Sequence, residues 1–142
     1  MEKIQFDSGI REYKLNGMGV LRFNPGDPNL YARFLEAVEE MKNMEKTMAS
    51  RAGDQEGMTV LKILQDADKQ IKQSLNRVFG EGNDFDKILG GVNLLAIGAN
   101  GERVVTNLFA ALQPILLQGA EACAREQTRN AVERAKARRA MQ

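Results

Sequence analysis

The sequence predicts an α+β domain that is mostly α. Three observations lead to this prediction. Residues 1–24 are rich in β-favourable side chains, residues 28–100 carry apolar side chains at helical spacing, and residues 101–142 have the pattern of one long helix. We therefore expect a small N-terminal antiparallel β-meander packed on a helical bundle, followed by a long C-terminal helix.

The chain of 142 residues is long enough to bury a core as a single domain. Within residues 1–142 we expect a β-hairpin or meander over 1–24, a helical core over 28–100 and the long helix over 101–142. The basic end of this helix, from about residue 125, has little to bury, so it projects or is partly disordered; the sequence leaves both open.

The predicted strands are short. "KIQFDS" and "REYKLN" flank Gly9, and "GVLRF" follows a Gly-Met-Gly turn at 17–19. The sequence therefore predicts a meander of two or three strands and leaves the number open. The next stretch, "FNPGDPNL", reads as a structural joint rather than a ligand site. Pro25 and Gly26 suit a type II turn, Asp27 the N-cap and Pro28 the first helical position.

Two amphipathic helices are expected next. The first runs from Pro28 to about residue 49, and the second from Met58 to Phe79. The predicted buried face of the first contains Leu30, Phe34, Ala37, Val38, Met41, Met44 and Met48. That of the second is a seven-residue repeat of Leu61, Leu64, Ile71, Leu75 and Val78. Asp68 is its one polar member, and Ala67 is the alternative at that place.

A short helix should follow, capped by Asn83 or Asp84, docked by Phe85, Ile88 and Leu89, and ended by Gly90. The long helix begins at about residue 102 and contains Pro114. Its predicted buried face comprises Val105, Leu108, Phe109, Leu112, Ile115, Leu116, Gly119 and Cys123. Cys123 is expected to be buried and inert.

The composition argues against an enzyme. The chain has no His and one Cys, so it lacks the usual general base near neutral pH, Ser-His-Asp triads and Cys/His zinc sites. The acidic group of Glu81, Asp84 and Asp86 does not follow the spacing of a calcium loop, and no glycine cluster fits a nucleotide-binding pattern. We predict no catalytic residue, no cofactor and no metal.

Two sets of residues are candidates for partner binding. The first is the basic tail, where Arg125 accompanies the candidates Arg129, Arg134, Lys136, Arg138 and Arg139. It fits an acidic protein partner or, as the alternative function, a nucleic-acid backbone, but it has no aromatic residue on which bases stack. The second set is Met41, Met44 and Met48, which form either ordinary core or an adaptable groove for a partner helix.

A resemblance to a known family rests on two stretches. In "GVLRFNPGDPNLYARFLEAVEEM" a strand passes through a proline joint into an aromatic-bearing helix, and "LNRVFGEGNDFDKILGGVNLL" holds a Phe-Gly loop and a short helix. This layout, over roughly residues 10–120, resembles the tail assembly chaperones of long-tailed bacteriophages and prophages.

The resemblance implies a non-enzymatic protein that binds the tape measure protein and recruits tail tube subunits. It also implies that the protein acts in the cytoplasm of the bacterial host and is absent from the finished virion. The sequence itself predicts no membrane span. It leaves self-association open, and it favours a protein over nucleic acid as the partner.

Overall fold

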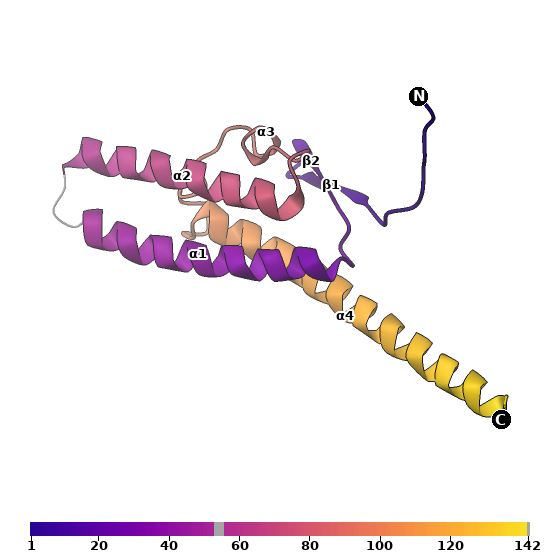
Figure 1. The fold of residues 1–142 in the computed structure, drawn as a ribbon. Coiled ribbons are helices and arrows are strands. Elements are labelled where there is room, and N and C mark those ends of the chain that lie inside the picture. Colours follow the sequence, from indigo (N-terminus) through magenta and orange to yellow (C-terminus); the bar gives the residue numbers. More distant parts are fainter. Residues whose placement is uncertain (53–55, 142) are drawn as a thin grey trace.

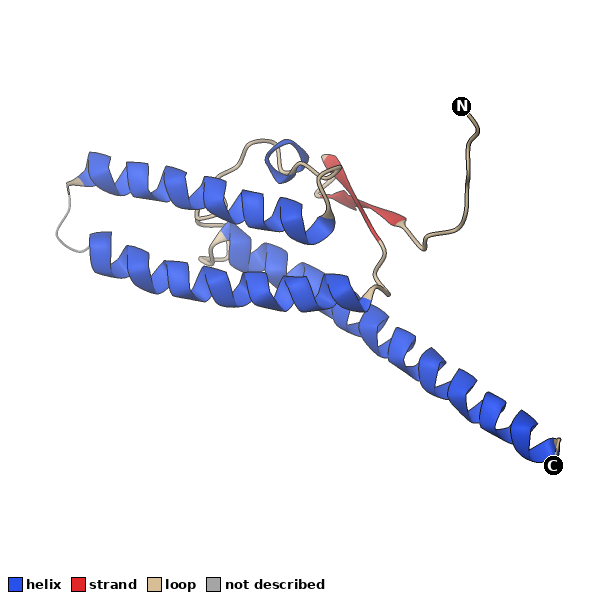
Figure 2. Ribbon diagram, viewed as in Figure 1, coloured by secondary structure: helices blue, strands red, loops and turns tan. Residues whose placement is uncertain are grey.

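The computed structural model describes residues 1–52 and 56–141, and it confirms the predicted fold class. Strands β1 (Arg11–Leu15) and β2 (Gly19–Phe23) pair in an antiparallel hairpin. The helices that follow are α1 (Pro28–Ala52), α2 (Gly57–Phe79), the short α3 (Phe85–Ile88) and α4 (Val104–Ala140). Helices α1 and α2 lie side by side, the first half of α4 packs against α1, and its second half projects into solvent (Figures 1 and 2).

The core lies where β2, α1, α2, α3 and the first half of α4 meet. Phe34 of α1 meets Phe109 of α4 edge to face, with ring centroids 5.3 Å apart. Phe23 of β2 meets Phe79 of α2 in the same way at 5.2 Å. The largest fully buried side chains are Phe34, Phe85, Leu21, Leu75, Leu94, Leu116 and Val105. The aromatic pairs therefore tie the hairpin and α4 to the α1–α2 pair.

The hairpin has two strands, one of the two numbers that the sequence left open, and residues 3–8 form no strand. Residues 1–10 adopt no regular structure, and Ile4 and Phe6 are 89% and 80% exposed. Strand propensity alone does not make a strand, because the backbone needs a partner edge, and no described segment supplies one to these residues. The turn between the strands spans Asn16–Met18 rather than the predicted residues 17–19, because β2 already begins at Gly19. Asn16 and Gly17 have φ values of 51° and 70°.

The joint between β2 and α1 is a turn, but not the predicted type II turn. Asp27 N–H donates to the carbonyl of Asn24 at 3.2 Å, while Gly26 does not have the positive φ that type II requires. The cause is the side chain of Asn24, whose Oδ1 accepts from Gly26 N–H at 2.8 Å. The rest of the prediction is confirmed. Asp27 caps α1 by accepting from Asn29 N–H at 2.9 Å, and Pro28 opens the helix.

The predicted repeat of α2 is only partly correct. Ile71, Leu75 and Val78 are buried as expected, but Leu61 is 56% exposed and Leu64 only half-buried. Ala67 is buried, as the alternative to Asp68 predicted, and Ile63, which the repeat did not include, is buried beside α1. The seven-residue repeat assumed one partner along the whole helix. In the structure α1 contacts one face, while the segment after α3 contacts another face at Asp68 and Lys72.

Helix α3 and helix α4 follow the prediction closely. Asp84 caps α3, Phe85 and Ile88 are buried, and Gly90 lies beyond the helix end with φ 67°. On α4, Val105, Phe109, Leu112 and Leu116 are buried, and Leu108 and Ile115 are half-buried. The prediction for Cys123 was wrong: its side chain is half-buried rather than buried, since the buried side chains of α4 end at Leu116.

Candidate partner-binding surfaces

The predicted basic residues lie on the projecting half of α4, which stays helical to Ala140. All of them are exposed: Arg125, Arg129, Arg134, Lys136, Arg138 and Arg139. Among the described residues, Arg129 pairs with Glu126 one turn earlier, and no ion pair involves the other five. Most of this positive charge is therefore available to a partner.

The basic residues flank a face of small side chains. At about 100° per residue, Arg125, Arg129, Lys136 and Arg139 fall within about 80° of one another around the helix axis. Arg134 and Arg138 fall on the opposite side. Between the two groups lie Ala124, Thr128, Ala131 and Ala135, which are exposed or half-buried. The projecting helix therefore presents a smooth stripe with cationic borders.

The three candidate methionines lie in different environments. Met41 and Met48 belong to the core and are each 8% exposed, whereas Met44 is half-buried. Met44 lines a shallow depression of about 290 Å³ between α1 and α2, together with Met48 and Ile63. Met41 does not line this depression, so the structure brings Met44 and Met48, but not all three methionines, to one opening between the helices.

A larger open groove of about 810 Å³ lies between the segment 7–13 and α4. Tyr13 and Ile10 line one side, and Ile115, Gly119 and Cys123 line the other. This groove was not predicted from the sequence, because its two walls are far apart in the chain. The backbone of Pro25 approaches α4 so closely that a Cβ on Gly119 would lie 1.8 Å from the Pro25 carbonyl oxygen.

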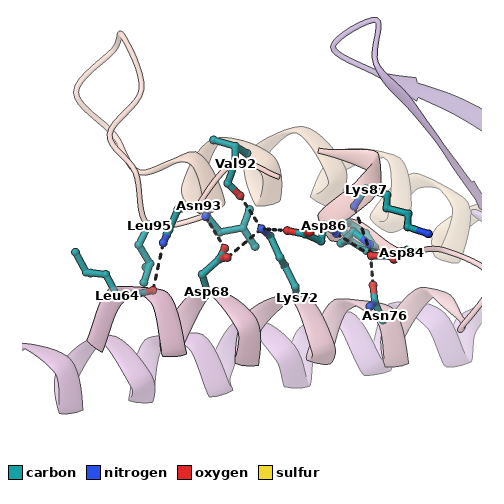
Figure 3. Close-up of polar contacts among 12 residues, drawn as sticks. Leu64, Asp68, Lys72, Asn76, Asp84, Asp86, Lys87, Val92, Asn93 and Leu95 are labelled. Atoms are coloured by element: carbon teal, nitrogen blue, oxygen red, sulfur yellow. Dashed lines mark hydrogen bonds and ion pairs between the residues drawn. The ribbon is translucent and has the colours of Figure 1, made fainter. Parts of the chain in front are cut away.

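The most connected polar group, Lys72, was not predicted from the sequence. Its Nζ donates to Asp68 Oδ2 at 2.9 Å, Asp86 Oδ1 at 2.6 Å and the Val92 carbonyl at 2.7 Å (Figure 3). Asp68 Oδ1 also accepts from Leu94 N–H at 2.8 Å. Asp68, the polar member of the predicted repeat, was the available signal, because Lys72 follows it at the i+4 spacing of an ion pair.

These contacts shift two pKa values in the directions expected for an ion pair. Burial disfavours the charged form of Lys72, but hydrogen bonds and charge from Asp86 and Asp68 outweigh it and raise the Lys72 pKa above 10.5. The hydrogen bond and the positive charge of Lys72 lower the pKa of Asp86 below 3.8. The ammonium has three acceptors and its carboxylates are engaged, so this network is built to hold α2, α3 and residues 92–94 together.

Asparagine side chains make the other polar links around α3. Asn83 is 6% exposed, and its amide nitrogen donates to the Phe79 carbonyl at 2.9 Å and the Arg22 carbonyl at 2.8 Å. Asn76 Oδ1 accepts from Phe85 N–H at 2.9 Å (Figure 3). Asn83 therefore joins β2 to the end of α2, and the predicted role as helix cap belongs to Asp84 alone.

No set of three or more Cys, Asp or Glu side chains in residues 1–52 and 56–141 is arranged to hold a metal ion. No helix in the same residues combines the length and apolar character required for a membrane span. Comparison with family models, curated proteins and solved structures finds no match to this chain.

Proposed function

We propose that this chain is a non-enzymatic assembly chaperone that binds a long helical partner along α4. The observation that carries the proposal is the projecting half of α4, which leaves the body of the protein with an exposed face of small residues bordered by Arg and Lys. A helix of this length whose second half packs on none of the described residues has surface to offer to another protein.

The chemistry of this face defines the partner. Small side chains let a second helix approach closely, and the two cationic borders match acidic residues on either side of that helix's apolar stripe. Exposed ion pairs contribute little each and are screened by salt, so the complex should be reversible. Reversible binding suits a protein that keeps a partner soluble and then leaves.

In its specific form the proposal follows the resemblance in the sequence. The partner would be the tape measure protein of a long-tailed phage or prophage, and the complex would recruit tail tube subunits before tail completion. The protein would act in the host cytoplasm and be absent from the virion. The match between a long exposed helix and a long helical partner supports this assignment.

Co-expression tests the proposal. The partner in the test is the tape measure protein, and the measurement is its soluble fraction with and without this chain. We expect soluble partner only with the intact chain. The double substitution Lys136→Glu/Arg139→Glu should reduce the soluble fraction severalfold, because it cancels the net positive charge of one cationic border.

The matched control is Lys62→Glu/Lys69→Glu, which makes the same change in charge on exposed positions of α2 and should leave the soluble fraction unchanged. A partner that is equally soluble without this chain contradicts the proposal. Salt-sensitive DNA or RNA binding that is lost on deletion of residues 125–142 would instead support the alternative of a nucleic-acid-binding accessory protein.

A further inference from the structure

The two edges of the β-hairpin differ, because only one of them is occupied. On the outer edge of β2, Arg22 N–H donates to Asn83 Oδ1 at 2.9 Å, and Asn83 Nδ2 donates to the Arg22 carbonyl at 2.8 Å. The carboxamide of Asn83 thus satisfies both backbone groups that a further strand would use there. This edge is closed to strand addition.

The outer edge of β1 is open. Arg22 lies opposite Glu12, and its backbone groups point away from β1, so Glu12 and Arg22 form a non-hydrogen-bonded pair. The N–H and C=O of Glu12 therefore point away from β2, and by alternation those of Lys14 do as well. The sheet of the described residues consists of β1 and β2 alone, so no strand covers these groups.

We propose that the open edge of β1 pairs antiparallel with β1 of a second copy of this chain. The pairing would join two hairpins into a continuous four-stranded sheet around a twofold axis. This inference does not depend on the proposed function. It identifies the surface for the self-association that the sequence leaves open.

Charge selects one register for this pairing. A twofold axis that brings the free backbone groups opposite one another can pass through Glu12, Tyr13 or Lys14. An axis at Glu12 places two glutamates opposite each other, and an axis at Lys14 places two lysines opposite each other, both unfavourable. An axis at Tyr13 places Glu12 of each copy opposite Lys14 of the other. Strand β1 is therefore complementary to itself in that register.

The inner face of the sheet favours the same register. Tyr13 is half-buried and stacks on Phe23, with ring centroids 4.7 Å apart. At the twofold axis the two Tyr13 residues form a non-hydrogen-bonded pair, the arrangement in which opposite side chains are closest. The open groove between Tyr13 and α4 leaves room beside this ring, so each tyrosine can cover the other.

The chain's own N-terminal segment does not take this place. The Ser8 carbonyl accepts from Asn24 Nδ2 at 3.0 Å, and Asn24 directly follows β2. Residues 1–8 therefore lie beyond the end of the hairpin (Figure 1). Folding back onto the open edge would break this contact.

The proposed dimer should be weak and concentration-dependent, because two five-residue strands bury little surface.

Sedimentation velocity over a range of protein concentrations tests the proposal. The wild-type chain should convert reversibly from monomer to dimer. The single variants Glu12→Lys and Lys14→Glu should each dimerise at least about tenfold more weakly, because each places like charges opposite one another twice. Lys62→Glu, a charge reversal remote from the hairpin, should dimerise like the wild type.

A mixture of the two single variants provides the decisive measurement. In the heterodimer both lysines of the Glu12→Lys chain face both glutamates of the Lys14→Glu chain, so mixing should restore a dimer of wild-type affinity. Such recovery also shows that each variant is folded. A wild-type chain that stays monomeric, or a mixture that dimerises no better than the separate variants, overturns the proposal. The proposal is also overturned if the edge of β1 pairs with a different protein and never with a second copy of this chain.

Discussion

Lys72 shows how one residue can organise several segments. Its ammonium joins a carboxylate on its own helix, a carboxylate on α3 and a backbone carbonyl of the segment after α3. A buried ammonium with fewer acceptors would cost several kcal/mol of desolvation without compensation. Because all three donors are used, the charge can stay buried, and the three segments are fixed relative to one another.

The substitution Lys72→Met tests this role. It keeps most of the side-chain volume but removes the donors, leaving the half-buried Asp68 without its ion pair. We expect a loss of about 2–4 kcal/mol in the free energy of unfolding. Urea unfolding followed by circular dichroism measures it. Lys69→Met, at an exposed position of the same helix, is the control and should change stability by less than about 0.5 kcal/mol.

The ion pair between Asp86 and Lys72 should make the stability of the fold depend on pH. Because Lys72 lowers the Asp86 pKa below 3.8, this pair stabilises the fold fully above that pH, and its contribution is lost as pH falls through the folded-state pKa. The Lys72 pKa is raised above 10.5, so the corresponding alkaline loss occurs only above that value. The substitution Asp86→Asn should lower stability at pH 7 and flatten its decrease below pH 3.8. Parallel pH curves for the two proteins would contradict this account.

Among the elements, α4 and the β2–α1 joint fit together at a glycine. Gly119 lies where the Pro25–Gly26 backbone meets α4, and a Cβ there would lie 1.8 Å from the Pro25 carbonyl oxygen. The obstacle is backbone rather than a flexible side chain, so it cannot move aside without moving the joint. The proline turn thus positions the hairpin on α4 as well as starting α1.

Gly119→Ala should therefore destabilise the protein although alanine is the better helix former. We expect a loss of about 1–3 kcal/mol from overpacking, larger than the gain of up to about 1 kcal/mol from helix propensity. The control is Gly57→Ala at the start of α2, where a Cβ meets nothing within 4 Å. Thermal unfolding distinguishes the two, and a Gly119→Ala protein as stable as the wild type would show that the joint does not pack as described.

How far the sequence predicts each element depends on whether its partner is nearby in the chain. The caps at Asp27 and Asp84 and the helix starts were predicted because neighbouring residues determine them. The exposure of Leu61 and the lack of a strand over residues 3–8 could not be predicted in this way, since burial and strand pairing depend on distant segments. The basic residues of α4 were identified correctly as exposed charge, whereas the groove beside β1 needed the fold.

At the scale of the whole molecule, the protein combines a packed body with a helix that extends beyond it. Buried side chains on α4 end at Leu116, yet the helix continues to Ala140. Helices gain most of their stability from tertiary packing, so the two halves of α4 should differ in stability although they form one continuous element.

Hydrogen exchange resolved by residue measures that difference. Amides around Val105–Leu116 should exchange only on global unfolding, whereas amides from about residue 125 onward should exchange many times faster, through local fraying. Deletion of residues 125–142 should accordingly change the free energy of unfolding by less than about 1 kcal/mol, because this segment packs on nothing in the described structure. A helical partner that binds along α4 should slow exchange in the projecting half selectively. Equal protection along all of α4 without a partner would show that the projecting half is held by contacts absent from this structure.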